Sequence, residues 1–373
     1  LKGHEHDLWD LSPRELLSNL VMKIIRSTFT GINRISRFVN RILDKLVTRR
    51  DIKKGLYQYD PASNMDELLG RFQERLNILA KSVLRDHQAI ERVLSKDFTT
   101  PLTSSLFKGC IKRGKDVYEG GADFNSSGIQ AVGVTDVADS LHAINEVVFK
   151  QKLYSINDVI LAIDSNFKGR RNQQIRQALL SVPKFGNDNS PESTGWVTKV
   201  MGIFNNALDS VPHHTRRNAR YSAGYYALNI GTQYGINTQA LPSGRKAGVP
   251  LANSIIPHYG MKQSNLFSTL NSVSGVDFVE HAENGATATL TIDSALFQGR
   301  GGAKKLGAII KTFLTKGGMQ LQPNVLNREM LLDAYVHPEK YPDLLVRIAG
   351  YCAYFNELSD QMKKVIINRS CYS

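Results

Sequence analysis

The stretch LLVRIAGYCAYF, residues 344–355, places a single glycine inside a mostly apolar run. Glycine in the interior of a regular element costs about 0.5–1 kcal/mol relative to alanine, so its presence needs a reason. A bulge or a close approach of backbone is one reason. The other is chemical, because an α-carbon without a side chain can itself be the reactive group. Arg347 and Tyr351 stand close to this glycine, Gly350.

Other catalytic groupings are absent from the sequence. No hydrolase elbow, metalloprotease motif, phosphate-binding loop or dinucleotide fingerprint occurs. The three cysteines, Cys110, Cys352 and Cys371, have no zinc or iron–sulfur spacing, so we expect no metal site. Their odd number and wide separation argue against a disulfide framework and favour a reducing cytoplasm. Cys352 is predicted to be a buried core thiol.

Two glycine-rich stretches carry polar residues that need interpretation. The cluster Asn125, Ser126 and Ser127 precedes an apolar run and predicts either the wall of a pocket or ordinary turn chemistry. Glu119, beside two glycines, is a possible general base but is more typical of a solvated turn. The segment PSGRKAG, residues 242–248, is typical of a simple basic surface turn.

Hydrophobic periodicity predicts the elements that position these residues. A long amphipathic helix is expected from Met65 to Leu94, with a capping-box-like start at Ser63 and Asp66. Further helices are expected at about 102–109, 137–144, 156–166, 171–181, 194–210, 302–316, 328–335 and 359–369. Strands are expected at 286–293 and 319–326, the second restricted by Pro323 to a sheet edge or a bulge. The run around Gly350 predicts a strand or an interrupted strand pair.

Bulk properties indicate a globular protein. The chain has 373 residues, 42% hydrophobic and 22% charged, and exceeds the size of one hydrophobic core. No apolar run approaches the roughly 18–20 residues of a membrane helix, so membrane contact is not expected. The first residue is Leu, which suggests a processed chain or a fragment of a longer one.

The net charge of +13 is concentrated near the start of the chain. Residues 14–54 contain eleven basic and three acidic side chains, a net +8. Apolar residues recur there at helical spacing, which predicts an amphipathic helix with a basic face. Such a helix packs on its own protein or binds an anionic surface. Without an aromatic ladder or an RNA-binding signature, no nucleic-acid partner is expected.

The C-terminal stretch 344–369 resembles the signature of glycyl radical enzymes, the family of pyruvate formate-lyase and the cobalamin-independent glycerol dehydratases. Arg347 to Tyr351 matches the pattern R-[VI]-[SA]-G-[YF] of that family. Three further blocks match in order, and the resemblance covers about residues 65–373. They are RGKDVYEGGADFNSSGIQAVGVTDVADSL, ALPSGRKAGVPLANSI and GGMQLQPNVLNREMLLDAYVHPEKYPDL.

The resemblance implies an α/β fold, the C-terminal half of a ten-stranded barrel of two five-stranded half-sheets surrounded by helices. It implies that Gly350 carries a radical, with Arg347 and Tyr351 supporting its loop. Asn125, Gln130 and Tyr226 are candidates for the pocket wall. A partner activase that uses S-adenosylmethionine and an iron–sulfur cluster would install the radical, so no bound cofactor is expected. A cysteine on a second loop would then become a thiyl radical that takes hydrogen from the substrate. A homodimer is also expected.

The family's thiyl cysteine would lie around or before residue 20, and no cysteine precedes Cys110. We therefore expect residues 61–250 to be the C-terminal part of a lyase-like domain and 251–373 to be the glycine radical domain. Residues 1–60 form an atypical basic segment. The function expected is that of a cytoplasmic lyase or dehydratase for a small hydroxylated substrate, with diol, choline, isethionate, arylacetate and arylsuccinate chemistries all open. The alternative is a non-catalytic relative that binds partners through its basic helix.

Overall fold

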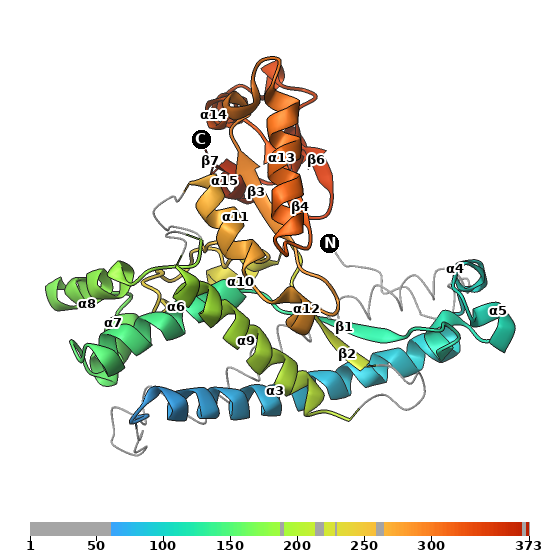
Figure 1. Ribbon diagram of the computed structural model, residues 1–373, viewed down its shortest axis with the longest axis horizontal. Coiled ribbons are helices and arrows are strands. Elements are labelled where there is room, and N and C mark those ends of the chain that lie inside the picture. Colours follow the sequence, from blue (N-terminus) through green and yellow to red (C-terminus); the bar gives the residue numbers. More distant parts are fainter. Residues whose placement is uncertain are drawn as a thin grey trace, which may run out of the picture. The chain divides into compact units, whose positions relative to one another are not determined.

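The computed structural model describes residues 61–186, 190–212, 220–227, 230–258, 265–367 and 371–372. The chain divides into two units, Leu1–Pro61 and Ala62–Ser373, and the second contains almost everything described. The basic helix predicted within residues 14–54 lies outside the described residues. The second unit mixes helices and short strands (Figure 1).

Helices dominate the first half of the second unit. They are α3 (Met65–Asp97), α4 (Pro101–Leu106), α5 (Cys110–Arg113), η1 (Val117–Glu119), α6 (Val134–Ile144), the π-helix η2 (Asn145–Lys150), α7 (Ile156–Asp164), α8 (Arg170–Ser181), α9 (Pro191–Asp209) and α10 (Gly231–Asn237). The long helices agree with the hydrophobic pattern within a few residues. Among the described helices, none combines the length and the apolar character that a membrane crossing requires.

The start of α3 differs in detail from the prediction. Asn64 caps the helix, since its side chain accepts a hydrogen bond from the Glu67 N–H at 2.9 Å. The Ser63 backbone and hydroxyl both donate to the Glu67 carboxylate at 2.8 Å. The predicted pairing of Ser63 with Asp66 was therefore wrong by one residue, because the capping position is Asn64.

Strands form three small sheets in the described part of the chain. β1 (Ser126–Gln130) pairs in parallel with β2 (Arg220–Gly224). β3 (Ala288–Ile292) lies between β4 (Leu321–Val325) and β7 (Cys371–Tyr372), also in parallel, and all five of its residues are buried. β5 (Leu345–Arg347) and β6 (Cys352–Tyr354) form an antiparallel hairpin. No closed barrel is formed by the strands that the structure describes.

Pro323 lies on β4, opposite Leu290 of β3. In the described sheet β4 has β3 as its single neighbour, so the strand is at the edge, as predicted. The reason is that proline has no N–H to give to a second neighbouring strand.

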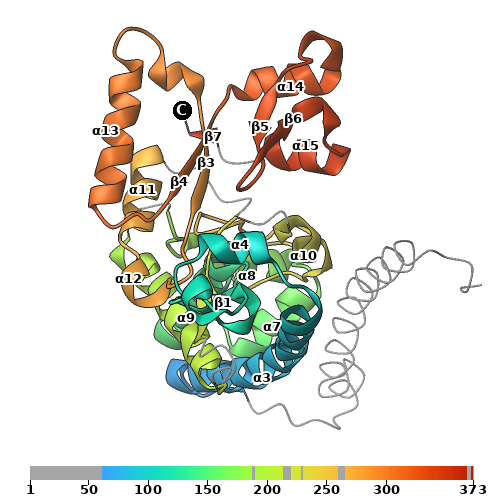
Figure 2. The same cartoon turned by 90° about the vertical axis from the view of Figure 1, so that its right-hand side faces the viewer.

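The remaining helices surround the second and third sheets. They are α11 (Leu266–Ser274), α12 (Phe278–His281), η3 (Ser294–Phe297), α13 (Gly302–Thr315), α14 (Arg328–Val336), η4 (Pro338–Lys340), η5 (Phe355–Glu357) and α15 (Asp360–Ile367). In Figure 2, α14 and α15 lie beside the β5–β6 hairpin. This arrangement gives the C-terminal hairpin helical support of its own.

Buried apolar residues form three clusters. The largest draws on α3, α6, α9, α11, β2 and β3, and a second joins α6, η2, α7 and α8. The third packs α14 and α15 against the hairpin and includes Val346, Ile348 and Phe355, each at most 2% exposed. Each such side chain contributes about 1.5–3 kcal/mol by burial, which stabilises a hairpin too short to persist alone.

Candidate functional site

Gly350 lies in the four-residue loop, 348–351, that joins β5 to β6. The Ile348 N–H donates to the Tyr351 carbonyl at 3.0 Å and closes the loop. The Arg347 N–H donates to Oδ1 of Asn324 at 3.3 Å, which connects the hairpin to β4. The interrupted strand pair predicted from the sequence is confirmed, and the glycine stands at its tip.

Nothing in the geometry of Gly350 requires a glycine. The residue is exposed, and a Cβ built on it would meet no atom within 4 Å. It is also absent from the residues with positive φ. By contrast, a Cβ on Gly235 would lie 2.4 Å from the carbonyl oxygen of Val249, so that position needs glycine for packing. Neither a bulge nor a close approach therefore accounts for Gly350, and its chemical role stays a prediction.

A cavity of about 480 Å³ lies beside Gly350. Backbone and side chains from four separate segments form its wall. The lining residues are Tyr226, Ala227, Asn284, Gly285, Ala286, Thr287, Met319, Gln320, Gln322 and Gly350. Two residues predicted from the sequence, Gly350 and Tyr226, are thus brought together although 124 positions separate them. The polar side chains in the wall suit a small hydroxylated molecule.

Tyr226 is held from two sides. The amide of Asn284 donates to the Tyr226 hydroxyl at 3.2 Å, and the amide of Gln130 donates to the Tyr226 carbonyl at 2.9 Å. Gln130 does not line the cavity itself and acts as a support for its wall. Asn284 was missed by the sequence analysis, although the Asn-Gly step before a predicted strand is a signal for a turn at this point.

Asn125 lies elsewhere. Its amide donates to the carbonyl of Ala122 at 2.9 Å, within the loop that leads into β1, and it is not among the residues that line the cavity. Ser126 and Ser127 belong to β1 rather than to a turn. Glu119 is exposed in η1, as expected for a solvated carboxylate.

Two cysteines have described side chains. Cys110 is buried at the start of α5. Cys352 is exposed, so its predicted burial was wrong. The reason is that side chains alternate along β6: Ala353 packs against the third cluster, so Cys352 and Tyr354 lie on the opposite, exposed face. Tyr351 is also exposed, at 53%, while Arg347 is half-buried.

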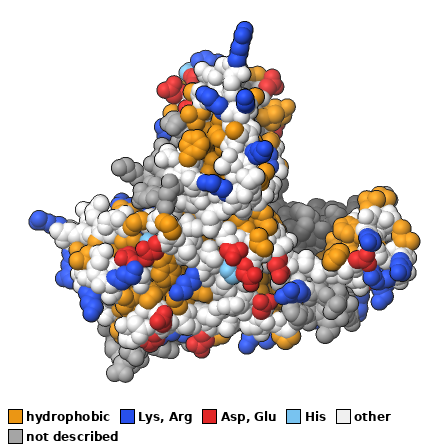
Figure 3. All heavy atoms as spheres, in the orientation of Figure 1, with side chains coloured by type: hydrophobic (Ala, Val, Ile, Leu, Met, Phe, Trp, Pro, Cys, Tyr) orange, Lys and Arg blue, Asp and Glu red, His pale blue; other side chains and the backbone are white. Residues whose placement is uncertain are grey.

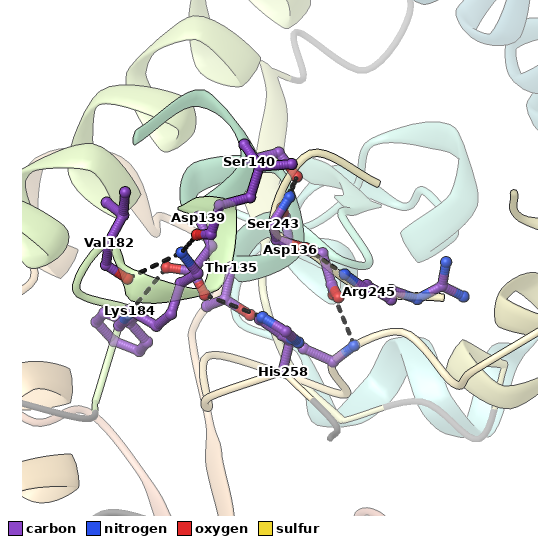
Figure 4. A network of polar contacts seen from close by, with 12 residues as sticks. Thr135, Asp136, Asp139, Ser140, Val182, Lys184, Ser243, Arg245 and His258 are labelled. Carbon is purple, nitrogen blue, oxygen red and sulfur yellow. Dashed lines mark hydrogen bonds and ion pairs between the residues drawn. The ribbon is translucent and has the colours of Figure 1, made fainter. Parts of the chain in front are cut away.

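A second polar group is fully buried on α6 and the loops around it (Figure 4). Asp136 accepts a hydrogen bond from the Ala252 N–H at 2.8 Å, and Asp139 accepts one from the Phe185 N–H at 2.9 Å. Lys184 donates to the carbonyls of Leu179 and Val182 at 2.6 and 2.9 Å. Burial raises the pKa of both aspartates to about 7.

Arg245 overturns the prediction for PSGRKAG. It is 3% exposed and donates to the carbonyls of Gln239 and Gly235 at 2.8 and 2.9 Å. The segment is therefore an anchored loop rather than a simple surface turn. Because its guanidinium is occupied by backbone carbonyls, it is not available as a phosphate site.

An apolar groove of about 550 Å³ lies between α11 and α13. Leu266, Phe267, Leu270, Ile309 and Phe313 are among its lining residues, and Figure 3 shows hydrophobic side chains gathered over these helices. An apolar wall does not satisfy the hydroxyl groups of a small polar substrate. The polar cavity beside Gly350 is therefore the better candidate for substrate binding.

Comparison with known proteins agrees with this geometry. A family profile described as "Pyruvate formate lyase-like" matches residues 41–235, and one described as "Glycine radical" matches residues 251–356. These matches define a radical-enzyme fold with a glycine radical domain at its C-terminal end. The chain belongs to the pyruvate formate lyase-like family, and the predicted fold class is confirmed.

Three relatives illustrate the similarity. A probable dehydratase of Escherichia coli (strain K12), YbiW, is 29% identical over 318 residues, which are 83% of this chain and 38% of that protein. The trans-4-hydroxy-L-proline dehydratase of Clostridioides difficile is 27% identical over 323 residues, 85% of this chain and 40% of that protein. The glycerol-bound B12-independent glycerol dehydratase of Clostridium butyricum superposes with a TM-score of 0.79 at 29% identity, over 85% of this chain and 39% of that chain. The chain thus spans about two fifths of the length of these relatives.

Proposed function

We propose that this chain is the glycine-bearing part of a glycyl radical lyase or dehydratase that acts on a small hydroxylated substrate. One observation carries the proposal: Gly350 stands at the edge of a polar cavity, in a loop where neither φ nor packing requires glycine. A hydrogen atom removed from its α-carbon leaves a radical between an electron-donating amide nitrogen and an electron-withdrawing carbonyl. The missing side chain lets that centre become planar.

The hairpin keeps this α-carbon accessible to a partner. Gly350 and its neighbour Tyr351 are exposed, so an activase can reach the glycine without unfolding the core beneath it. The activase would supply the hydrogen abstraction through S-adenosylmethionine and an iron–sulfur cluster. The hydrogen bond that the Arg347 N–H donates to Oδ1 of Asn324, at 3.3 Å, holds the loop in place.

The cavity wall would orient the substrate. Tyr226 can exchange hydrogen bonds with a substrate hydroxyl, and Asn284 fixes the direction of the tyrosine hydroxyl at 3.2 Å. The side-chain oxygen Oε1 of Gln322 accepts a hydrogen bond from the Thr289 hydroxyl at 3.0 Å, which leaves the side-chain amide hydrogens of Gln322 for a ligand. Such a wall binds small polyols or hydroxylated amino acids better than apolar arenes.

The cysteine that meets the substrate would come from a segment other than those that carry Cys110 and Cys352. Cys110 is buried in α5, and Cys352 lies on the same hairpin as the glycine. Neither lies on a separate loop that faces the cavity, which is the arrangement that hydrogen transfer between glycine, cysteine and substrate requires.

Electron paramagnetic resonance of the activated chain tests the proposal. Anaerobic incubation with the activase of a related dehydratase should give a doublet from coupling to the remaining α-hydrogen. Protein labelled with α-deuterated glycine should give a collapsed doublet. Gly350→Ala should give no signal, whereas Tyr351→Phe, which keeps the loop, should retain it. Identical blank spectra from the native chain and Gly350→Ala would exclude the glycine radical.

The charge distribution favours a second candidate function. A net +8 within residues 14–54 suits binding to an anionic surface or partner, with the radical machinery unused. This function would give binding to anionic vesicles that weakens as salt rises, because exposed charges are screened. Salt-independent binding, or none, would contradict it.

A further inference from the structure

A buried histidine faces two carboxylates where α6 continues into the π-helix η2. His142 is 1% exposed, and neither of its ring nitrogens has a hydrogen-bond partner in the part of the chain that the structure describes. Its Nε2 lies 3.7 Å from Oε1 of Glu192. Buried imidazole nitrogens normally have a hydrogen-bond partner. The unpaired ring nitrogens of His142 therefore point to a ligand that the imidazole and the two carboxylates could bind together.

The two carboxylates come from different elements. Glu146 follows His142 by four residues and lies in η2, while Glu192 lies in the first turn of α9. One ligand atom from each of the three side chains lies within 4.8 Å of the others. Single turns of π-helix often mark functional sites. The separation of Glu192 from the other two along the chain explains why no ligand spacing was visible in the sequence.

The site already attracts positive charge. The ammonium of Lys150 lies 2.7 Å from Glu146 and 3.1 Å from Glu192. The Lys150 side chain is 54% exposed, so it can move into solvent without unpacking the core. The Glu146 and Glu192 carboxylates therefore define a cation-binding position. The flexible Lys150 side chain occupies it and can be displaced from it.

We propose that His142, Glu146 and Glu192 bind a divalent first-row transition metal ion of the Zn²⁺, Mn²⁺ or Co²⁺ type, in place of the Lys150 ammonium. Mg²⁺ and Ca²⁺ take oxygen ligands, whereas an imidazole nitrogen combined with carboxylates suits the transition ions. Three protein ligands leave at least one position for water or a small ligand. The ion would also join the α6–η2 helix to the start of α9.

Trp196 offers a direct readout. Its ring stacks near the His142 ring, with centroids 6.1 Å apart and an interplanar angle of 24°. The chain has two tryptophans, so the Trp9→Phe background leaves Trp196 as the sole indole emitter. Bound Co²⁺ should quench this emission in a saturable way. Added Zn²⁺ should displace the Co²⁺ and restore the emission.

Four variants in that background decide the proposal. His142→Ala should abolish saturable quenching, and Glu192→Gln should weaken Co²⁺ binding at least about tenfold. Lys150→Gln should tighten it, because the competing cation is removed. His337→Ala is the matched control. His337 forms an exposed pair with Glu339, with 3.5 Å between Nδ1 and Oε1, and is not part of the proposed site, so its variant should leave the titration unchanged.

Quenching that rises linearly with Co²⁺ and is equal in the parent and Glu192→Gln would overturn the proposal. Equal or weaker binding by Lys150→Gln would also overturn it. Glu192 is 53% exposed, so we expect Glu192→Gln to fold. This variant therefore tests metal binding even if His142→Ala does not fold. Circular dichroism of each variant establishes which ones are folded.

Discussion

Burial sets the ionisation of Asp136. The residue is 1% exposed, and desolvation raises the pKa of its carboxyl group to about 7, against the opposing effects of the Ala252 N–H and the nearby Arg245 guanidinium. Desolvation prevails because the carboxylate loses more free energy of hydration on burial than it regains from one backbone hydrogen bond and one nearby guanidinium. Asp136 therefore makes the stability of the fold dependent on pH.

The Asp136→Asn variant tests this effect. Between the ordinary pKa of 3.8 and the folded value of about 7, the folded chain keeps a proton that the unfolded chain has lost. The free energy of unfolding therefore falls as pH rises through this window, by up to about 1.4 kcal/mol per pH unit for this group. Asparagine keeps the shape and the Ala252 bond without titrating. Urea unfolding from pH 5 to 8 should give a flatter profile for the variant.

Asp343→Asn, at an exposed position, is the control and should leave the slope unaltered. Asp139, whose pKa is also raised to about 7 by burial, should keep part of the slope in Asp136→Asn. An unchanged profile in Asp136→Asn would mean that Asp136 is ionised throughout and compensated by Arg245.

Individual residues differed in how far the sequence could reveal them. Gly350 stood out as a candidate because a glycine in an apolar run conflicts with local propensity, and its role stays a prediction. Arg245 and Asn284 did not. The role of Arg245 depends on how the loop folds its guanidinium onto the nearby Gln239 and Gly235 carbonyls, and that of Asn284 depends on the Tyr226 hydroxyl from a distant segment. Cys352 was misjudged because the burial of a strand depends on its neighbours, which its own sequence does not specify.

At the scale of elements, the β5–β6 hairpin depends on its surroundings. Each strand has three residues, and two-stranded hairpins of this size are marginal in water. The apolar contacts of Val346, Ile348 and Phe355 and the bond from the Arg347 N–H to Asn324 hold it in place. Positioning of Gly350 is therefore sensitive to a residue on another strand.

Asn324→Ala should loosen the hairpin without unfolding the chain. Asn324 is 5% exposed, and loss of its bond to the Arg347 N–H should lower the free energy of local opening by about 1–2 kcal/mol. Hydrogen exchange at Arg347 should accelerate about tenfold, and the radical yield at Gly350 should fall. Asn237→Ala removes a comparable bond, to the Gln233 carbonyl in α10, and should change neither quantity. Equal exchange in both variants would contradict the role of Asn324.

Helices were predictable because their apolar stripes are local, and α3, α8 and α13 begin and end close to the expected residues. The pairing of β1 with β2 was not, because it joins segments about 90 residues apart. The π-helix η2 also escaped prediction, since its pattern continues that of α6. The local sequence therefore predicts the bounds of the long helices well, but it does not predict which strands pair.

At the scale of the whole molecule, the proposed function separates radical storage from substrate chemistry. The chain spans about two fifths of the length of its relatives, and its cysteines are at positions 110, 352 and 371. The glycine, its hairpin and one wall of the cavity lie within the described residues. We expect the thiol that faces the substrate to be provided by another polypeptide segment.

Turnover by the activated chain tests this separation. With diols, choline or isethionate, the chain alone should keep its glycine radical and form no product, because no thiol transfers hydrogen from the substrate. A segment of a related dehydratase that contains the second loop, with the cysteine that becomes the thiyl radical, should when added in trans allow a small hydroxylated substrate to be converted. Gly350→Ala with the same segment should remain inactive. Product formed by the chain alone would instead assign the thiyl role to one of its own cysteines. Cys352, exposed two residues after Gly350, would then be the first candidate, and Cys352→Ser should abolish the activity.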